Sequence, residues 1–173
     1  MMKKLLSFIF GLSLFLSACT WSDKDYEDTT SSEPLKIALV IMEGGSAGDT
    51  IGCGDAIYFA SKEVSIEPSI KARIEAALEA LFSIETALYG EQRFYNALST
   101  SSITESSVNV SPNGDVSVAL TGALLSAGTC DDPRIEEQIK QTIAANAETN
   151  ANISVTINGQ DLNAYFDMSG GAE

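Results

Sequence analysis

Apolar positions near residue 35 predict two strands at the start of the folded part of the chain. Residues 35–42, LKIALVIM, are apolar at both alternating sets of positions apart from Lys36, which is typical of a strand covered on both faces. A glycine-dense loop follows. Residues 53–64, CGDAIYFASKEV, predict a second strand, with Ile57 and Phe59 on one of its faces.

A helical pattern comes next, and Pro68 and Ser69 suit its first turn. Its apolar positions recur at three- and four-residue spacing, which indicates one stripe facing a core. The stripe consists of Ile70, Ile74, Ala77, Leu78, Leu81 and Phe82. We interpret this stripe as core packing and not as a ligand site.

The clearest local signal is a β-hairpin in SVNVSPNGDVSVAL. Valines alternate with polar residues over residues 107–110, and the alternation resumes over residues 116–120. Asn113 and Gly114 lie between the two runs. Both residues tolerate positive φ, so they predict the hairpin turn.

A second helix follows a loop of small residues. Asp132 is placed to cap this helix, with Pro133 as its first residue. Ile135, Ile139 and Ile143 repeat every four residues and predict its buried face.

The C-terminal part predicts further strands. Residues 153–159, ISVTING, alternate as a strand that ends in an Asn158–Gly159 turn, and we expect a short additional strand over residues 161–166. The predicted order is ββαββαβ. We therefore expect one α+β domain over residues 35–168, a mixed β-sheet with two helices packed on one face. We expect residues 169–173 to be a disordered tail.

The N-terminal residues 1–18 have the layout of a secretory signal. Lys3 and Lys4 precede an apolar run that is shorter than the roughly 20 residues of a membrane-spanning helix. Residues 16–19, LSAC, resemble the lipobox of bacterial lipoproteins. That resemblance implies cleavage before Cys19 and a lipid on its sulfur atom. Labelled palmitate should then be incorporated into the protein. The alternative is an ordinary signal peptide with a cysteine nearby.

Residues 19–34 are predicted to form the lipidated cysteine and a flexible acidic tether, since they are polar and rich in Ser and Thr. A calcium loop is excluded because Asp28 and Pro34 occupy the positions that need Gly and Glu. Several acyl chains anchor a protein firmly, whereas a single chain is marginal. We therefore expect the domain to be lipid-anchored to the cell membrane, on its extracytoplasmic side.

Charge excludes one class of partner. The chain has 10 Lys+Arg and 24 Asp+Glu, a net charge of −14. Loss of Lys3 and Lys4 with the signal leaves 8 basic residues against 24 acidic ones, a net charge of −16. Such a surface repels phosphates, so we expect no nucleic-acid partner.

Several motifs together resemble one known domain family. They are CGDAIYFASKEV, AALEALF, VNVSPNGDVSVAL, and GTCDDPRIEEQIKQTI followed by ISVTINGQDL. Their order over residues 35–166 resembles the GerMN domain of spore-germination and sporulation lipoproteins and other bacterial envelope proteins. Residues 84–101 depart from that pattern, because they are longer and more aromatic. The resemblance implies a role in assembling envelope or sporulation machinery.

With Cys19 assigned to the lipid, Cys53 and Cys130 remain for an exported domain, and we expect them to form a disulfide. Both lie in glycine-bearing loops. The chain contains no histidine, so Cys–His nucleophilic chemistry is excluded, and zinc would lack soft third and fourth ligands. A buried pair of free thiols is the alternative.

The absence of histidine also removes the Ser–His–Asp triad, so an enzyme would depend on a carboxylate pair, as in glycoside hydrolysis. The candidate acids are Asp55, Glu63, Asp131, Asp132 and Glu136. Each has a simpler structural role, at a helix start, in a turn or on a solvated strand edge. We therefore expect no catalytic residue, no metal and no cofactor.

The resemblance to GerMN domains implies a non-catalytic protein-interaction or assembly module with an envelope protein as partner. Exposed edge strands and the aromatic pair Phe94 and Tyr95 are the expected contact surfaces. The alternatives are a carboxylate-dependent cell-wall glycan hydrolase and a peptidoglycan- or sugar-binding domain. The sugar-binding alternative would use Trp21, Tyr89 and Tyr95.

Overall fold

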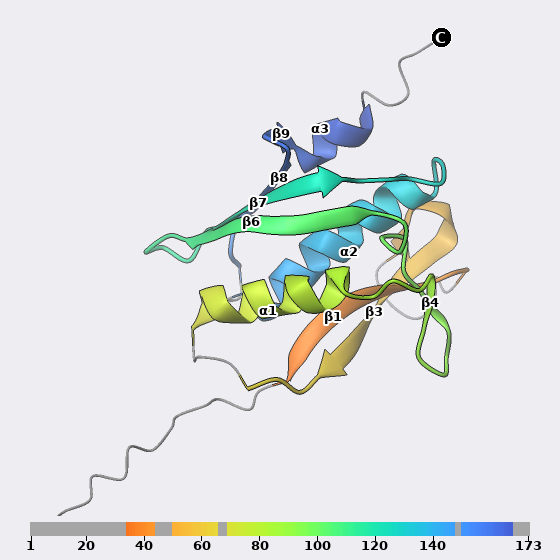
Figure 1. The fold of residues 1–173 in the computed structure, drawn as a ribbon, viewed down its shortest axis with the longest axis horizontal. Coiled ribbons are helices and arrows are strands. Elements are labelled where there is room, and N and C mark those ends of the chain that lie inside the picture. The colour runs from red at the N-terminus through yellow and green to blue at the C-terminus, as the bar shows by residue number, and fades with distance from the viewer. Residues whose placement is uncertain (1–33, 44–49, 66–68, 148–149, 168–173) are drawn as a thin grey trace, which may run out of the picture.

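The computed structural model describes residues 34–43, 50–65, 69–147 and 150–167, which adopt an α+β fold, as predicted (Figure 1). The predicted signal peptide, the lipidation site Cys19, almost all of the tether and the C-terminal tail lie outside the described residues. No helix in the described ranges has the length and apolarity needed to cross a membrane.

The first sheet has five strands in the order β2-β3-β1-β5-β4, and all of its pairs are antiparallel. Its strands are β1 (Leu35–Ile41), β2 (Thr50–Ile51), β3 (Asp55–Lys62), β4 (Leu88–Tyr89) and β5 (Phe94–Tyr95). β1 pairs with β3 along its whole length, from Leu35 to Ile41, so these two strands form the body of this sheet.

The second sheet has four strands in the order β6-β7-β8-β9. They are β6 (Ser102–Val110), β7 (Val116–Ala123), β8 (Ile153–Ile157) and β9 (Gln160–Asp161). β7 and β8 run parallel, because the second long helix crosses over between them, and the other two pairs are antiparallel.

The prediction of one mixed sheet is therefore wrong. α1 (Ile70–Phe82) and α2 (Asp131–Asn146) lie between two separate sheets (Figure 1). α1 contacts β1 and β6, whereas α2 contacts β1 and β8. Each sheet covers one side of the helix pair, which gives a sheet–helix–sheet arrangement of three layers.

The reason for two sheets is that the second edge of β1 is already occupied. β5 pairs with β1 only at Val40, and along the rest of that edge polar side chains of α2 bond to the β1 backbone. The β6–β7 hairpin consequently cannot extend the first sheet. It packs on the other side of the helices instead.

The stripe of α2 that closes this edge consists of Gln138, Thr142 and Asn146, all at most 2% exposed. Gln138 Nε2 donates to the Ala38 carbonyl at 3.1 Å, and Thr142 Oγ1 accepts the Ala38 N–H at 2.9 Å. Asn146 exchanges two hydrogen bonds with the Lys36 backbone, of 3.2 and 2.7 Å. These side chains do for β1 what a neighbouring strand would do.

The core confirms both predicted helix stripes. Ile74, Leu78 and Leu81 of α1 are fully buried, and so are the α2 isoleucines 135, 139 and 143. They belong to one apolar cluster that also contains Ile37 and Leu39 of β1 and residues of β6, β7 and β8. The two helices thus join the two sheets into a single core.

Both helix starts differ from the prediction. Ser69, expected in the first turn of α1, is instead its N-cap, with its Oγ accepting the Ala72 N–H at 3.1 Å, and Pro68 lies outside the described residues. The expected cap at Asp132 is wrong, because α2 begins at Asp131 and Cys130 occupies the cap position. The Gly128 carbonyl accepts the N–H groups of Asp131 and Asp132, so the preceding loop closes this first turn without a side-chain cap.

The two Asn–Gly turns also differ. Asn158 and Gly159 both have positive φ, 52° and 83°, and form the predicted two-residue turn between β8 and β9. In the β6–β7 hairpin only Gly114 has positive φ, 88°, and Ser111 N–H bonds to the Asp115 carbonyl across three residues. Pro112 fixes a negative φ at the first of those three residues, which favours the longer turn.

The expected strand over residues 161–166 is wrong, because α3 (Leu162–Asp167) occupies that segment. β9 ends at Asp161, whose Oδ1 accepts the Asn163 N–H at 2.9 Å in the manner of a helix cap. Leu162 is 1% exposed and packs into the core. The buried leucine and the aspartate together favour a short helix over a strand.

Candidate functional site

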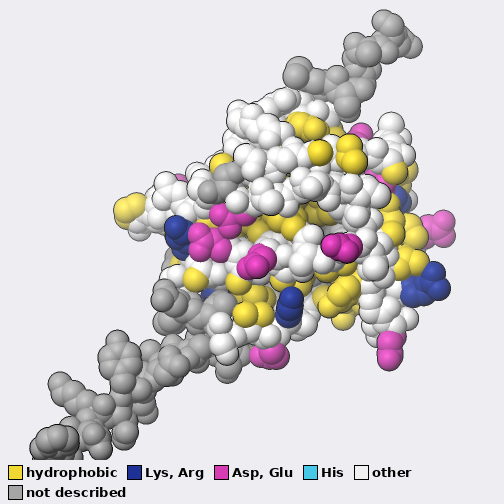
Figure 2. Space-filling view, viewed as in Figure 1, with side chains coloured by type: hydrophobic (Ala, Val, Ile, Leu, Met, Phe, Trp, Pro, Cys, Tyr) yellow, Lys and Arg dark blue, Asp and Glu magenta, His cyan; other side chains and the backbone are white. Residues whose placement is uncertain are grey.

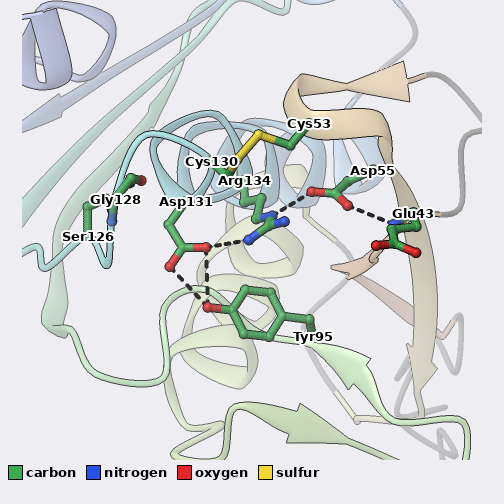
Figure 3. Close-up of a disulfide and its surroundings, with 9 residues drawn as sticks. All are labelled: Glu43, Cys53, Asp55, Tyr95, Ser126, Gly128, Cys130, Asp131 and Arg134. Carbon is green, nitrogen blue, oxygen red and sulfur yellow. Dashed lines mark hydrogen bonds and ion pairs between the residues drawn. A yellow bond between two sulfur atoms is a disulfide. The ribbon is translucent and has the colours of Figure 1, made fainter.

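Cys53 and Cys130 are joined in a disulfide, with Cα atoms 5.7 Å apart (Figure 3). Cys53 lies in the short 3-10 turn η1 (Gly52–Gly54) before β3, and Cys130 immediately precedes α2. The bond therefore ties the first sheet to the start of the second long helix. The free-thiol alternative does not describe this structure.

Gly52 allows the two bonded segments to approach closely. A Cβ atom at this position would lie 2.7 Å from Pro133 Cγ, inside van der Waals contact. Cys53 itself has a φ of 63°, in the left-handed region. The Gly-Cys-Gly sequence thus serves the contact between η1 and the first turn of α2.

A charged cluster lies beside the disulfide and connects the same two segments (Figure 3). Arg134 Nε bonds to Asp55 Oδ2 at 2.6 Å, and Arg134 Nη1 bonds to Asp131 Oδ1 at 2.8 Å. Both aspartates are buried, with Asp55 1% exposed. Removing one member of such a cluster would leave a buried charge without its partner, at a cost of about 3–5 kcal/mol.

Asp55 also holds a loop. Its Oδ1 accepts the N–H of Glu43, which follows β1, at 2.8 Å. The expectation that Asp55 stabilises a turn is consistent with this bond, but the buried ion pair with Arg134 was not foreseen. An asparagine at this position would keep the bond to Glu43 and lose the charge that faces Arg134.

Tyr95 completes the cluster. Its hydroxyl group donates to Asp131, 3.0 and 3.2 Å from the two carboxylate oxygens, and Arg134 Cζ lies 5.3 Å from the centroid of its ring. Burial and the hydrogen bond to Asp131 raise the pKa of Tyr95 above its usual value. The phenol therefore stays protonated at neutral pH and acts as a fixed donor.

Arg134 is the centre of this arrangement. Burial lowers the pKa of its guanidinium, but the hydrogen bonds and charges of Asp55 and Asp131 outweigh that effect and raise the pKa overall. An open hollow of about 420 Å³ adjoins the cluster and is lined by Met42, Tyr95 and Arg134, among others. The charged groups that line the hollow are engaged with each other, which is the arrangement of a structural clamp.

The five candidate acids are not gathered into one site. Asp55 and Asp131 both bond to Arg134. Asp132 lies in the first turn of α2, and Glu136 forms an ion pair with Lys140 one turn later. Glu63 is exposed, just after the end of β3. Within the described ranges, no group of three or more Cys, Asp or Glu residues has a geometry that could hold a metal ion.

An aromatic pair reaches across β1, from β3 to β5 of the first sheet. Tyr58 of β3 stacks on Phe94 of β5 with ring centroids 3.8 Å apart, and Tyr58 and Phe59 are 37% and 39% exposed. β2 covers β3 only at Asp55 and Ala56. Beyond Ala56, no other described strand lies beside the outer edge of β3.

Sequence reasoning missed two groups of residues at these places. No role was predicted for Arg134, although Asp131 lies three residues earlier, which is the spacing of an ion pair on a helix. The closing stripe of α2 was also missed, and its signal is a run of uncharged polar residues every four positions beside the isoleucine stripe.

Comparison with known proteins adds no relative. No family model, no curated protein and no solved structure matches this chain.

Proposed function

We propose that this protein is a membrane-anchored envelope lipoprotein whose domain is a non-catalytic interaction or assembly module. The lipobox-like residues 16–19 support the anchor. The resemblance of the motifs to GerMN domains supports a place in cell-envelope or sporulation complexes. The two buried acids of the Arg134 cluster support a structural role for the carboxylates over a hydrolytic one.

The observation that carries this proposal is the open outer edge of β3. An exposed strand edge presents unpaired N–H and C=O groups, and a partner strand that adds to it gains a hydrogen-bonded ladder. Tyr58 and Phe59 point to opposite faces of the strand, since neighbouring residues alternate. A partner strand would therefore find one exposed aromatic ring on each side of the ladder.

The stacking of Tyr58 on Phe94, a residue of β5 on the other side of β1, holds the Tyr58 ring in one position. Two stacked rings restrict each other, so less rotational freedom remains to be lost on binding. The proposed partner is an envelope protein with an accessible strand or extended segment.

Photo-crosslinking in native membranes tests the contact surface. A photoreactive amino acid at Phe59, in the otherwise unchanged full chain, should give one discrete crosslinked product. The same amino acid at Ser117, an exposed position on the inner strand β7, is the matched control and should give none. No product from position 59, or the same product from both positions, would contradict the proposal.

The anchor has its own test. Cys19→Ala in the full chain should abolish incorporation of labelled palmitate and leave unprocessed precursor or released protein. Palmitate labelling that persists in this variant would show that Cys19 is not the lipidation site.

A further inference from the structure

A second surface of different chemistry lies between α1 and β6. An open groove of about 430 Å³ has one wall on α1. This wall consists of Glu75, Glu79 and Phe82 of the helix and of Ser83, its C-cap residue. The other wall consists of Ile103, Thr104 and Glu105 of β6. Figure 2 shows acidic side chains in a row over α1, with an apolar strip between them and the sheet.

The groove reaches the open edge of β6. Consecutive residues of a strand point to opposite faces, so a groove that touches three consecutive residues of β6 follows the edge of the strand and not one face. β6 is the terminal strand of its sheet and pairs only with β7 among the described strands. A bulge between Glu105 and Ser107 leaves Ser102 to Glu105 as the regular part beside the groove.

The groove has an excess of negative charge over an apolar floor. Glu75, Glu79 and Glu105 line it, and the only cation paired with them among the described ion pairs is Lys71, which bonds to Glu75 on the exposed side of α1. Burial, and then repulsion from Glu75 and Glu79, raise the pKa of Glu105, although Lys71 lowers it. A cation in the groove would therefore relieve an existing repulsion.

We propose that this groove binds an extended polypeptide segment in which Lys or Arg alternates with apolar residues. The backbone of the segment adds to the edge of β6. Its cationic side chains all point to the face that α1 covers, where their aliphatic stems contact Phe82 and Ile103 and their charged ends pair with the three glutamates. The intervening apolar side chains point to the other face of the sheet. The strand edge supplies pairing without sequence preference, and the glutamates supply the selection for positive charge.

The dimensions of the groove suit such a segment. The part of the helix that lines the groove, from Glu75 to Ser83, rises about 12 Å at about 1.5 Å per residue. Five extended residues cover about 13 Å at roughly 3.3 Å per step. Cationic side chains at the first, third and fifth of these residues match the three glutamates of the groove in number.

This inference extends the proposed interaction function, because it gives the module a second contact surface on the opposite sheet. The two surfaces differ in chemistry, since the β3 edge is aromatic and the groove is acidic. A module with both would hold two partners at once, or two segments of one partner.

The test uses the full-length chain in a neutral detergent and a fluorescein-labelled peptide in which three lysines alternate with two valines. Fluorescence anisotropy should show binding of this peptide and none of the same peptide with glutamate in place of lysine. The double change Glu75→Gln and Glu79→Gln should weaken binding at least about tenfold. The double change Glu91→Gln and Glu137→Gln removes the same charge elsewhere and should change affinity less than about twofold.

Backbone pairing has a separate signature. N-methylation of one alternate set of peptide N–H groups should abolish binding, and methylation of the other set should not, because only every second N–H of an added strand faces its neighbour. Equal binding of both methylated peptides, equal losses in the two double variants, or no binding of the lysine peptide to the unchanged chain would each overturn the proposal.

The two proposals fail separately. If the crosslink from position 59 forms in the Glu75→Gln/Glu79→Gln chain but the lysine peptide does not bind the unchanged chain, only the groove is refuted. If the peptide binds as expected and the crosslink is absent, the groove stands and the β3 contact is refuted.

Discussion

Two helices of this molecule each run along the edge of a strand, with opposite results. α2 lies along β1 and closes its edge, because Gln138, Thr142 and Asn146 offer neutral donors and acceptors to the strand backbone. α1 lies along β6 and offers Glu75 and Glu79. In the described part of the chain, no hydrogen bond joins either glutamate side chain to the β6 backbone.

The difference lies in what the side chains can exchange. A strand edge presents N–H and C=O groups in turn, and an amide side chain serves both, whereas a carboxylate accepts only. A carboxylate beside a strand also carries a charge that a backbone C=O group repels. The α2 side thus completes a sheet, and the α1 side leaves room for a strand that brings its own N–H groups and positive charge.

The largest effect should come from breaking the closed edge. Gln138→Leu removes the side-chain partners of the Ala38 carbonyl and the Ala97 N–H, both of them buried. Asn96 Oδ1 loses one of its two donors and keeps the Leu98 N–H. Each unsatisfied buried group costs about 1–3 kcal/mol, so we expect a loss of about 4 kcal/mol of unfolding free energy. Urea unfolding followed by circular dichroism measures it.

Gln141→Leu on the same helix is the matched control, because Gln141 is only half-buried and bonds to Glu137. It should change stability by less than about 0.5 kcal/mol. Similar losses in the two variants would mean that the stripe of α2 is not what closes the β1 edge.

The next largest effect should come from the covalent bond that holds α2 at its N-terminus. Cys53→Ser with Cys130→Ser removes a bridge of sequence separation 77, and such a loss costs about 3 kcal/mol. Unfolding curves of the native and double-serine proteins should differ by that amount. Adding a reductant should bring the native protein to the variant's value and leave the variant unchanged, and any other pattern would contradict the bridge.

A smaller effect should follow from Thr142→Val, which keeps the side-chain shape and leaves the Ala38 N–H without its acceptor. We expect a loss of about 1.5 kcal/mol. Thr104→Val, the same change on the open edge strand, affects an exposed hydroxyl pair with Thr121 and should cost less than about 0.5 kcal/mol. Equal costs at the two positions would erase the distinction between the closed and the open edge.

The smallest effect should be a gain. Because the pKa of Glu105 is raised in the folded chain, the folded state binds that proton more tightly than the unfolded state does, and stability falls as pH rises through this range. Glu105→Gln should therefore stabilise the protein at pH 7, by less than about 0.5 kcal/mol, and the gain should vanish below the ordinary pKa of glutamate. A gain of equal size at pH 3.5 and pH 7 would exclude the electrostatic cause.

The sequence predicted the features that rest on a local period. The isoleucines of α2 recur every four residues, the valines of the hairpin alternate, and Asn158–Gly159 requires positive φ, so these elements follow from neighbouring residues alone. α3 was not predicted, because six residues are too few to show a helical period. The two-residue strand β9 just before it does not mark the boundary either.

The features that sequence reasoning missed depend on residues far apart in the chain. Arg134 and Asp55 are 79 positions apart, and nothing local marks them as partners. The division into two sheets depends on Gln138 and Thr142, because their side chains occupy the edge of β1. From the sequence alone, polar residues such as these would be expected to face solvent. Their burial follows only from the position of β1, about 100 residues earlier.

The disulfide also has a topological consequence. The peptide chain from Cys53 to Cys130 and the bond between the two sulfur atoms form a covalent ring that contains β3, α1 and the β6–β7 hairpin. A protease that cuts once inside this ring opens it without separating the two pieces. On a denaturing gel, a nicked molecule would therefore run as one band without reductant and as two bands with it. A domain exposed outside the cell would stay in one covalent piece after its first cleavage inside the ring.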